Sequence, residues 1–321
     1  MSGLPVLIVG FERTDNLRQV VDATLASSIV GTIYLSLDGP RGHGGEKARG
    51  IEPKYLEQLT ALARDRPGFQ FTRHDKNLGL RDHMRLAIDW VLSHEHAAAI
   101  LEDDCVPTPE FFSFTSEMLT LYQSDKRILT TTGTNMPTFK PESGNNHFFS
   151  RYPRVWGWAT WRDRWASVND IRKIPEEIFE EKVRNATKTL RGPVKRFWTV
   201  RFRGARRPAG SVWSYDLVLE ALSSDRMTVV PSKNLVLNIG EGIDGSHTKK
   251  FPQWIIKSNF YDSKEAFSAT QDVAVTPEVE FDKLVENLQF SNKPTKKWTV
   301  KLLALADRIY LIALAKIHRH R

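Results

Sequence analysis

The first third of the chain alternates short apolar runs with amphipathic stretches. Four runs have the length and composition of buried strands: residues 5–11, 32–37, 69–73 and 97–101. The stretches between them show helical spacing of apolar residues, and they predict helices after residue 13 and over residues 52–64 and 81–94. Strands that alternate with helices predict right-handed βαβ connections. The expected fold class is α/β, with a mixed, mostly parallel, Rossmann-like sheet flanked by helices.

The pattern changes after residue 124. Further strands are expected over residues 128–133, 147–149, 227–231 and 235–239, and an amphipathic helix is expected from residue 213 to 221. Residues 264–291 are polar with little periodicity, which is typical of a surface linker. Residues 298–317 predict a helix rich in leucine and isoleucine. We therefore expect one domain over residues 1–260, then a linker and a basic amphipathic helix over residues 261–321.

Three acids, Glu102, Asp103 and Asp104, directly follow the fourth apolar run. Carboxylates at the end of a buried strand repel one another and resist desolvation, unless a cation or the hydroxyls of a ligand lie between them. Hard oxygen ligands suit Mn²⁺ or Mg²⁺, and ligands of open α/β sheets bind at the carboxyl ends of strands. The triplet predicts a divalent metal that holds a diphosphate. The alternative is an acidic turn before the helix that starts near Pro109.

Four other polar side chains follow an expected strand or begin an expected helix: Arg13, Asp38, Arg81 and His83. Their positions would let them converge on one ligand at the same edge of the sheet. Asp38 could accept a hydrogen bond from a base, and Arg81 and His83 could hold a base or a phosphate. Taken singly, each could instead be a helix cap or a surface charge.

Composition and charge bound the class of protein. The chain has 321 residues and one cysteine, Cys105, so it forms no internal disulfide and fits a reducing compartment. The first residues lack the charged flank of a signal peptide, and no stretch reaches a clean transmembrane length. A cytoplasmic location is therefore expected.

The net charge of +8 is concentrated in residues 184–207 and 293–321. This indicates anionic partners: a membrane surface, a phosphate-bearing substrate or nucleic acid. No nucleic-acid module is recognisable, so nucleic acid is not an expected partner. Residues 184–207 could clamp an anionic acceptor or be a solvated basic face. The segment Lys293–Arg321 suits a helix that lies on the inner face of the cytoplasmic membrane, and a docked helix or an oligomer contact is the alternative.

Tryptophan is dense between residues 156 and 165, and Trp213 follows later. Indole faces stack well on sugars, and they also pack well in cores. Of the four tryptophans at positions 156, 158, 161 and 165, we expect two to pack in the core and at least one to contact substrate. The candidates for contact with a sugar or an acceptor are Trp156, Trp158 and Trp213, with core packing as the alternative.

Two further residues have candidate chemistry. Asp216 lies at the start of an expected helix and would be a general base if it faced a cleft. His247 lies in the glycine-rich stretch 240–248 and could bind a metal or a diphosphate. A helix cap and an exposed histidine are the respective alternatives.

Several segments together resemble GT-A fold glycosyltransferases. In the first half these are residues 77–83 (NLGLRDH), 100–104 (ILEDD) and 109–112 (PEFF), which are most similar to the branch that includes N-acetylglucosaminyltransferase I. In the second half residues 156–161 (WGWATW), 238–242 (NIGEG) and 245–248 (GSHT) resemble a bacterial group described as glycosyltransferases or "hemolytic protein HlpA-like" proteins. The likeness runs from about residue 4 to residue 255.

The resemblance implies a nucleotide-sugar donor, a divalent metal and inversion at the anomeric carbon. By position, Arg13, Asp38 and His83 would hold the nucleoside, and Glu102 would contact the ribose. Asp104 would bind the metal, and His247 would face the diphosphate. Residues 1–125 would form the nucleotide-binding half and residues 126–260 the acceptor-binding half, with Arg81 and Asp103 also in the donor site.

One departure concerns the base, which relatives place directly after the tryptophan, as Trp-Asp-Tyr. Here Ser214 occupies that position, and the next acid is Asp216. Two residues along a helix correspond to a rotation of roughly 200°. The backbone could be shifted to bring Asp216 in, another acid could serve, or the activity could be impaired.

The expected function is a metal-dependent inverting glycosyltransferase that moves a hexosyl or N-acetylhexosaminyl group. The expected donor is a UDP-sugar, and the acceptor a glycan or lipid-linked glycan of bacterial surface polysaccharide synthesis. The main alternative is an impaired protein that binds a nucleotide sugar or a glycan. A nucleotidyltransferase could share the sheet and the acids, but residues 10–13 (GFER) lack its usual glycine-rich phosphate loop.

Overall fold

The computed structural model describes residues 3–40, 50–207, 210, 212–240, 255–256 and 273–291. Eight strands form one sheet in the order β3-β2-β1-β4-β8-β6-β9-β7. Their bounds are β1 (Leu4–Gly10), β2 (Val30–Leu37), β3 (Phe69–Arg73), β4 (Ala97–Glu102), β6 (Ile128–Thr132), β7 (His147–Ser150), β8 (Trp158–Trp161) and β9 (Met227–Pro231). A second, two-stranded sheet pairs β5 (Cys105–Pro107) with β10 (Val236–Asn238).

Strands β1 to β4 pair in parallel, as the alternation of strands and helices predicts. Strand β8 runs antiparallel to β4 and to β6, and β7 runs antiparallel to β9. The predicted α/β class, with a mixed and mostly parallel sheet flanked by helices, is confirmed. The carboxyl ends of β2, β1 and β4 are therefore neighbours at one edge of the sheet.

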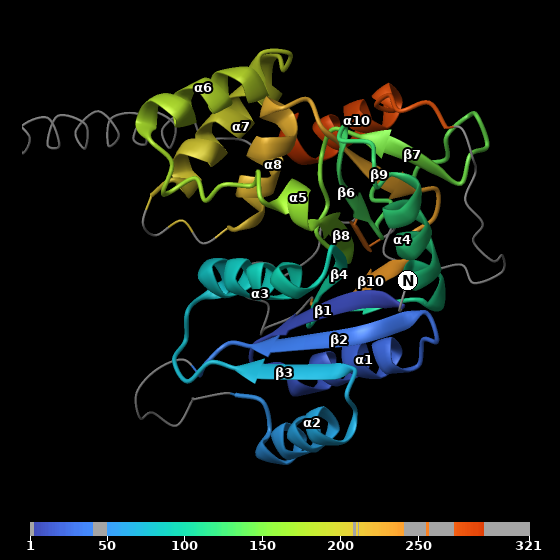
Figure 1. Cartoon of the computed structure of the whole chain (residues 1–321). Coiled ribbons are helices and arrows are strands. Elements are labelled where there is room, and N and C mark those ends of the chain that lie inside the picture. Colours follow the sequence, from blue (N-terminus) through green and yellow to red (C-terminus); the bar gives the residue numbers. More distant parts are fainter. Residues whose placement is uncertain are drawn as a thin grey trace, which may run out of the picture.

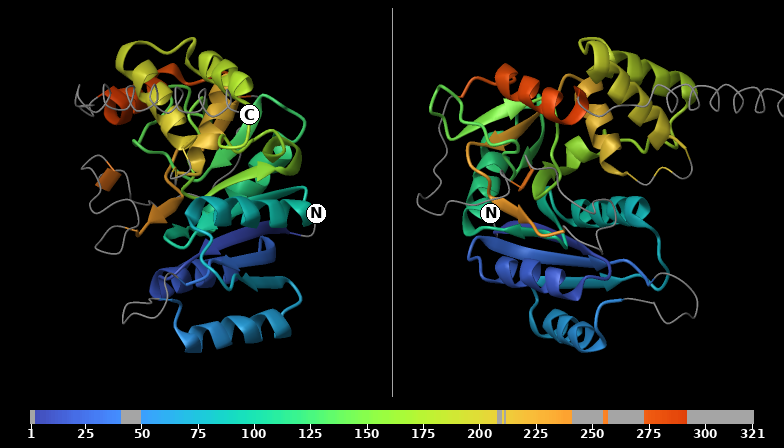
Figure 2. Two further views of the ribbon diagram at one scale, coloured as in Figure 1. Left: turned by 90° about the vertical axis from the view of Figure 1, so that its left-hand side faces the viewer. Right: turned by 180° about the vertical axis from the view of Figure 1, so that it is seen from behind.

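Helices cover both faces of the sheet (Figure 1). The helices of the first half are α1 (Thr14–Leu25), α2 (Pro53–Asp65), α3 (Leu80–His94) and α4 (Pro109–Leu121). Those of the second half are α5 (Arg162–Trp165), α6 (Glu176–Thr187), α7 (Gly192–Ala205), α8 (Ser214–Ser223), α10 (Val279–Val285) and the π-helical turn η1 (Glu286–Ser291). Two views at right angles and from behind show the helical group α6–α8 and α10 at the opposite end of the molecule from β1–β3 and α2 (Figure 2).

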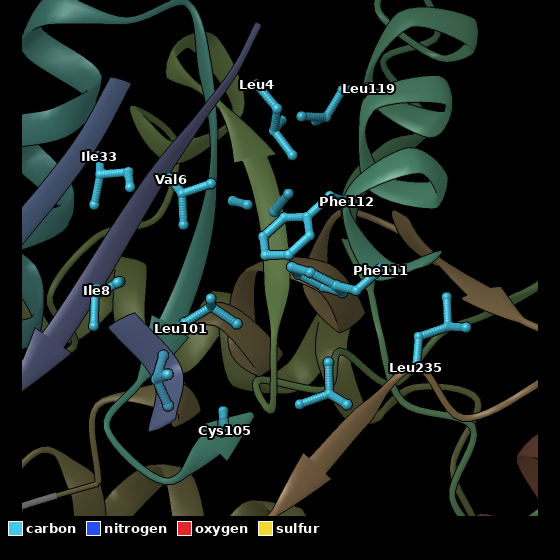
Figure 3. Close-up of a cluster of buried hydrophobic side chains, with 14 of the residues drawn as sticks. Leu4, Val6, Ile8, Ile33, Leu101, Cys105, Phe111, Phe112, Leu119 and Leu235 are labelled. Carbon is cyan, nitrogen blue, oxygen red and sulfur yellow. The ribbon is translucent and has the colours of Figure 1, made fainter. Parts of the chain in front are cut away.

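The position of β1 between two layers of helices explains why its sequence is continuously apolar and does not alternate with polar residues. Val6 and Ile8 are buried in a core with α1, α2 and α4, whereas Leu7 and Val9 are buried in a core with α3 and α8. A strand covered by helices on both faces buries consecutive side chains. The first of these cores extends to the single thiol, since Cys105 belongs to the same buried cluster as Leu101 and Phe111 (Figure 3). Cys105 is fully buried.

A third core joins the helices of the second half, and it includes residues expected in a linker. Phe281 and Val285 of α10 and Phe290 of η1 are buried against α6, α7 and β7. Residues 279–291 thus differ from the expectation, because they form helices that close this core. Two apolar residues at helical spacing among many charges are too weak a pattern for sequence alone to identify.

Other predictions fall on parts of the chain that the structure does not describe. The expected helix over residues 298–317, the basic segment Lys293–Arg321 and His247 lie outside the described residues. Within the described ranges, no helix has both the length and the apolar character needed to cross a membrane.

Candidate functional site

The three acids lie where β4 ends. Glu102 is the last residue of β4, and Asp103 and Asp104 form the tight turn into β5. Because β5 pairs with β10, the chain after β10 passes directly over this turn: the amide of Ile239 donates to the carbonyl of Asp104 at 2.8 Å. A Cβ on Gly240 would lie 2.2 Å from Asp104 Oδ2, so any larger residue there would displace the Asp104 carboxylate. The predicted glycine-rich stretch therefore begins against the acidic turn.

Arg13, which precedes α1, supplies the positive charge at this turn. Its Nη2 forms ion pairs with Asp103 and, at 3.0 Å, with Asp104 Oδ2. Asp103 also accepts a hydrogen bond of 3.2 Å from the amide of Phe11, at the end of β1. Burial opposes the charge on Arg13, but the two aspartates outweigh it and raise its pKa. The ends of β1 and β4 are thus joined by charge-assisted contacts.

Glu102 is left without such a partner. Its carboxylate forms no hydrogen bond or ion pair with the residues that the structure describes. Burial, together with the charges of Asp104 and Asp103, raises the pKa of Glu102 to about 8. Burial likewise raises the pKa of Asp103 to about 6, against the lowering effect of Arg13. The turn holds more carboxylates than cations, which is an arrangement that favours a bound cation.

The carboxylates of the acidic turn are the candidate ligands of a metal ion. Across the described ranges, no three His, Cys, Asp or Glu side chains are grouped so that they could hold a metal ion. Glu102 and Asp104 are both partly exposed, and Asp104, whose side chain is 18% exposed, is the one that lies against the start of the glycine-rich stretch. The residues therefore fit a divalent ion that takes one protein carboxylate and its other ligands from a bound diphosphate, from water or from outside the described residues.

Glu102→Gln is expected to stabilise the protein at high pH. The pKa of Glu102 lies above its value in the unfolded chain, so its contribution to stability is present at low pH and is lost as the pH rises through about 8. Glutamine removes that dependence and should raise the free energy of unfolding by about 1–3 kcal/mol at about pH 9, with little effect at about pH 5. Urea unfolding at both pH values measures the difference.

Glu57→Gln on the exposed face of α2 is the matched control, since it makes the same chemical change at a solvent-exposed position. An equal gain in both variants, or a gain that does not grow with pH, would contradict the environment assigned to Glu102.

Asp38, at the end of β2, builds the turn that precedes α3. Its Oδ1 accepts from the amides of Gly39 and Leu78, both at 2.8 Å. Its Oδ2 accepts from Asn77 Nδ2 at 3.0 Å and from the amide of Gly79 at 3.1 Å. The protein itself thus engages both oxygens. In this structure Asp38 shapes the edge of the sheet through the 77–79 turn, and contact with a base stays a prediction.

His83 lies on α3 next to the same edge. Its Nε2 is 2.9 Å from Ser36 Oγ of β2, and its ring packs edge-on against His74. Burial lowers the pKa of His83 to about 4, so the imidazole is neutral near pH 7. A neutral ring can form a hydrogen bond with a base or a hydroxyl but lacks the charge to attract a phosphate.

Arg81 and Asp216, predicted in different roles, are paired in the structure. Arg81 Nη2 is 2.5 Å from Asp216 Oδ1, and both side chains are buried. Asp216 Oδ1 also accepts from the amide of Ile171, and Oδ2 from Arg85. Burial raises the pKa of Asp216 to about 6, against the lowering effect of the two arginines. Asp216 could accept a proton from an acceptor only after this cluster had opened.

The predicted tryptophans divide into two groups. Trp158 and Trp213 are buried, and their rings stack with centroids 5.7 Å apart, so neither offers a face to a sugar in this structure. Trp156 is partly exposed and packs against the core of α1, α2 and α4. Gly157 between them has φ of +60°, and a Cβ there would lie 2.5 Å from Val236 Cγ2. Trp156 is the tryptophan that stays a candidate for substrate contact.

Two asparagines at the site were not predicted. Asn77 donates to Asp38 and to the carbonyl of Gly39. Asn238 Nδ2 lies 3.3 Å from Asp104 Oδ1, and its own Oδ1 accepts from the amide of Gly240. Both residues belong to the segments that carry the family resemblance. An asparagine directly before a glycine-containing turn, where its side chain can bond to nearby backbone, was the available signal.

No family model matches the chain, and no curated protein does either. Solved structures are similar to it at low identity. GalNAc-T7 with UDP, GalNAc and Mn²⁺ is 9% identical with a TM-score of 0.45, over 71% of this chain and 42% of that one. The mannosyltransferase PcManGT from Pyrobaculum calidifontis, in complex with GDP-Man and Mn²⁺, is 10% identical with a TM-score of 0.37, over 70% of each chain.

A third similar structure is CMP:2-keto-3-deoxy-manno-octonic acid synthetase complexed with CTP, which is 12% identical with a TM-score of 0.32, over 56% of this chain and 83% of that one. The aligned part thus covers less than half of the first of the three proteins. These similarities concern architecture, and the function of the chain rests on its own residues.

Proposed function

We propose that the chain is a glycosyltransferase that uses a nucleotide-sugar donor, bound at the carboxyl ends of β2, β1 and β4. The observation that carries the proposal is the acidic turn 102–104, where three carboxylates face one arginine and Glu102 is left without a partner among the described residues. A cation bound to a diphosphate would relieve this excess of negative charge. The resemblance of residues 77–83, 100–104 and 156–161 to GT-A fold enzymes supports the same assignment.

Each residue at this edge has a proposed role. Glu102 would accept hydrogen bonds from the ribose hydroxyls, since its carboxylate has free capacity. The 77–79 turn and neutral His83 would form the wall against the base, with Asp38 holding the turn in place. Arg13 would keep Asp103 and Asp104 in position.

The metal would be held by Asp104, with His247 as a second candidate ligand outside the described residues. Mn²⁺ or Mg²⁺ bound there would stabilise the charge of the departing diphosphate. The acceptor hydroxyl would attack the anomeric carbon from the opposite side and invert it. The rest of the proposal rests only on the resemblance and on the basic charge. It comprises a UDP-sugar as the donor, a glycan or lipid-linked glycan as the acceptor, and activity at the inner face of a bacterial membrane.

Calorimetric titration with UDP-, GDP- and dTDP-sugars, with Mn²⁺ and with a chelator, tests this proposal. We expect one nucleotide class to bind, and binding to weaken strongly when the metal is removed. Absence of binding by all three classes in the presence of Mn²⁺ would refute a donor site at this edge.

A second candidate function is donor or glycan binding without transfer. It is favoured by Ser214 at the position of the base and by the two arginines that engage Asp216. The two candidates differ in turnover: a transferase releases the nucleoside diphosphate from the donor, with water or a sugar as acceptor, whereas a binding protein returns the donor intact. Chromatography of donor incubated with the protein and Mn²⁺ separates these outcomes.

A further inference from the structure

Arg81 connects the two halves of the chain from inside the molecule. It lies in the first turn of α3 and is 3% exposed. Its Nη1 donates to the carbonyls of Ala205 at 2.7 Å and Gly210 at 3.2 Å, at the end of α7 and beyond it. Its Nη2 donates to Asp170 at 3.2 Å and to Asp216 of α8 at 2.5 Å. All four acceptors therefore belong to the second half, at separations of 89 to 135 residues.

A second arginine on the next turn of α3 strengthens the connection. Arg85 Nη1 lies 3.2 Å from Asp216 Oδ2, and its Nη2 donates to the carbonyl of Val168 at 2.9 Å. Its guanidinium also lies 5.2 Å from the ring centroid of Trp165. Asp216 is thus held between two cations of α3.

The loop after α5 completes the cluster. Arg172 forms ion pairs with Asp170, at 2.8 Å, and with Asp82 of α3. Three charged residues in the first two turns of α3 (Arg81, Asp82 and Arg85) therefore contact the 168–172 loop, the end of α7 and α8. A buried ion pair adds little net stability, because desolvation offsets the attraction, but loss of one partner leaves an uncompensated buried charge.

The opposite side of the start of α3 faces the proposed donor site. Helix α3 begins directly after the 77–79 turn, whose amides bind the carboxylate of Asp38. His83, on the same turn of the helix, contacts Ser36 of β2. One turn of helix thus joins the edge of the parallel sheet on one side and the buried cluster on the other.

We propose that Arg81 and Asp216 are positioning residues that align the donor edge with α8 and the segment before it. Asp216 would then act through Arg81 and α3, and it would take no proton from the acceptor. The alignment itself rests on the geometry alone, whereas its effect on turnover rests on the proposed glycosyltransferase function. Trp213, which directly precedes α8, stacks on Trp158.

Amide hydrogen exchange tests the alignment without any substrate. Asp216→Asn keeps the size of the side chain and removes its charge. We expect the amides of Leu78 and Gly79 to exchange about tenfold faster or more, while amides of β1 keep their rates. Unchanged exchange at residues 78 and 79, or a uniform increase over the whole chain, would overturn the proposal.

Glu180→Gln is the matched control. Glu180 of α6 pairs with Arg203 of α7 at 2.9 Å, in the same helical group, and among the described residues this pair forms no hydrogen bond or ion pair with α3. This variant should leave the exchange of residues 78 and 79 unchanged. A response equal to that of Asp216→Asn would mean that exchange at the turn reports general loosening, and it would also overturn the proposal.

Turnover distinguishes positioning from proton transfer. If Asp216 acts through Arg81, then Arg81→Gln, Asp216→Asn and the double variant should each lower kcat by a similar factor, about tenfold or more, because either change releases the same contact. A base at Asp216 predicts loss of turnover in Asp216→Asn with unchanged exchange at residues 78 and 79, and effects of the two changes that multiply. Wild-type protein that binds no donor would refute the proposed function, and the exchange measurement would still decide the alignment.

Discussion

Asp104→Asn is expected to lower the affinity for the nucleotide-sugar donor in the presence of Mn²⁺ by about 100-fold or more, since it removes the proposed protein ligand of the metal. The side chain of Asp104 is partly exposed, and it lies between Arg13 and the start of the glycine-rich stretch. Asparagine keeps its size, and Arg13 retains its ion pair with Asp103. The variant should also lose the difference between titrations with Mn²⁺ and with a chelator.

Asp65→Asn is the control for this change. Asp65 lies at the end of α2, is exposed and pairs with Arg64. Its replacement by asparagine therefore removes one negative charge far from the acidic turn. Donor affinity should be unaffected there. If Asp104→Asn bound the donor as tightly as the control and still responded to Mn²⁺, the metal would have to be held elsewhere.

Trp158→Ala is expected to lower the free energy of unfolding by about 3–5 kcal/mol, since it leaves a large cavity in a close-packed core. Trp158 is fully buried, stacks on Trp213 and tilts against Trp165 at 6.2 Å. Its indole Nε1 has no hydrogen-bond partner in the described part of the chain, so the loss comes from packing. Urea unfolding measures the change.

Trp156→Ala is the companion variant. Trp156 is partly exposed, so Trp156→Ala should lower the free energy of unfolding by less than Trp158→Ala does. If Trp156 contacts the substrate, Trp156→Ala should lower the rate of sugar transfer more than the conservative core variant Trp158→Phe does. A Trp158→Ala protein of wild-type stability that had lost transfer would instead assign Trp158 to sugar contact.

The sequence by itself determined the first half of the fold. The strands at β1 to β4 and their parallel pairing followed from short apolar runs separated by helical patterns. The place of the acidic turn followed as well, because the end of a strand is a local property that the switch from apolar to acidic residues marks. Polar residues after strands that are neighbours in a parallel sheet then meet at one edge, as Arg13 does with Asp103 and Asp104.

The tertiary structure alone decided the partner of each charge and the surroundings of each ring. Arg81 and Asp216 are 135 residues apart, and no local pattern relates them. Both Trp156 and Trp158 suit a core or a sugar by composition, and only the helices that cover β8 separate the buried ring from the partly exposed one. Residues 279–291 belong to the third core because Phe281 packs against aromatic residues that are distant in the sequence, such as Phe148. The periodicity of a segment shows which face of its helix or strand is apolar. Which residues pack against that face depends on segments far away in the chain.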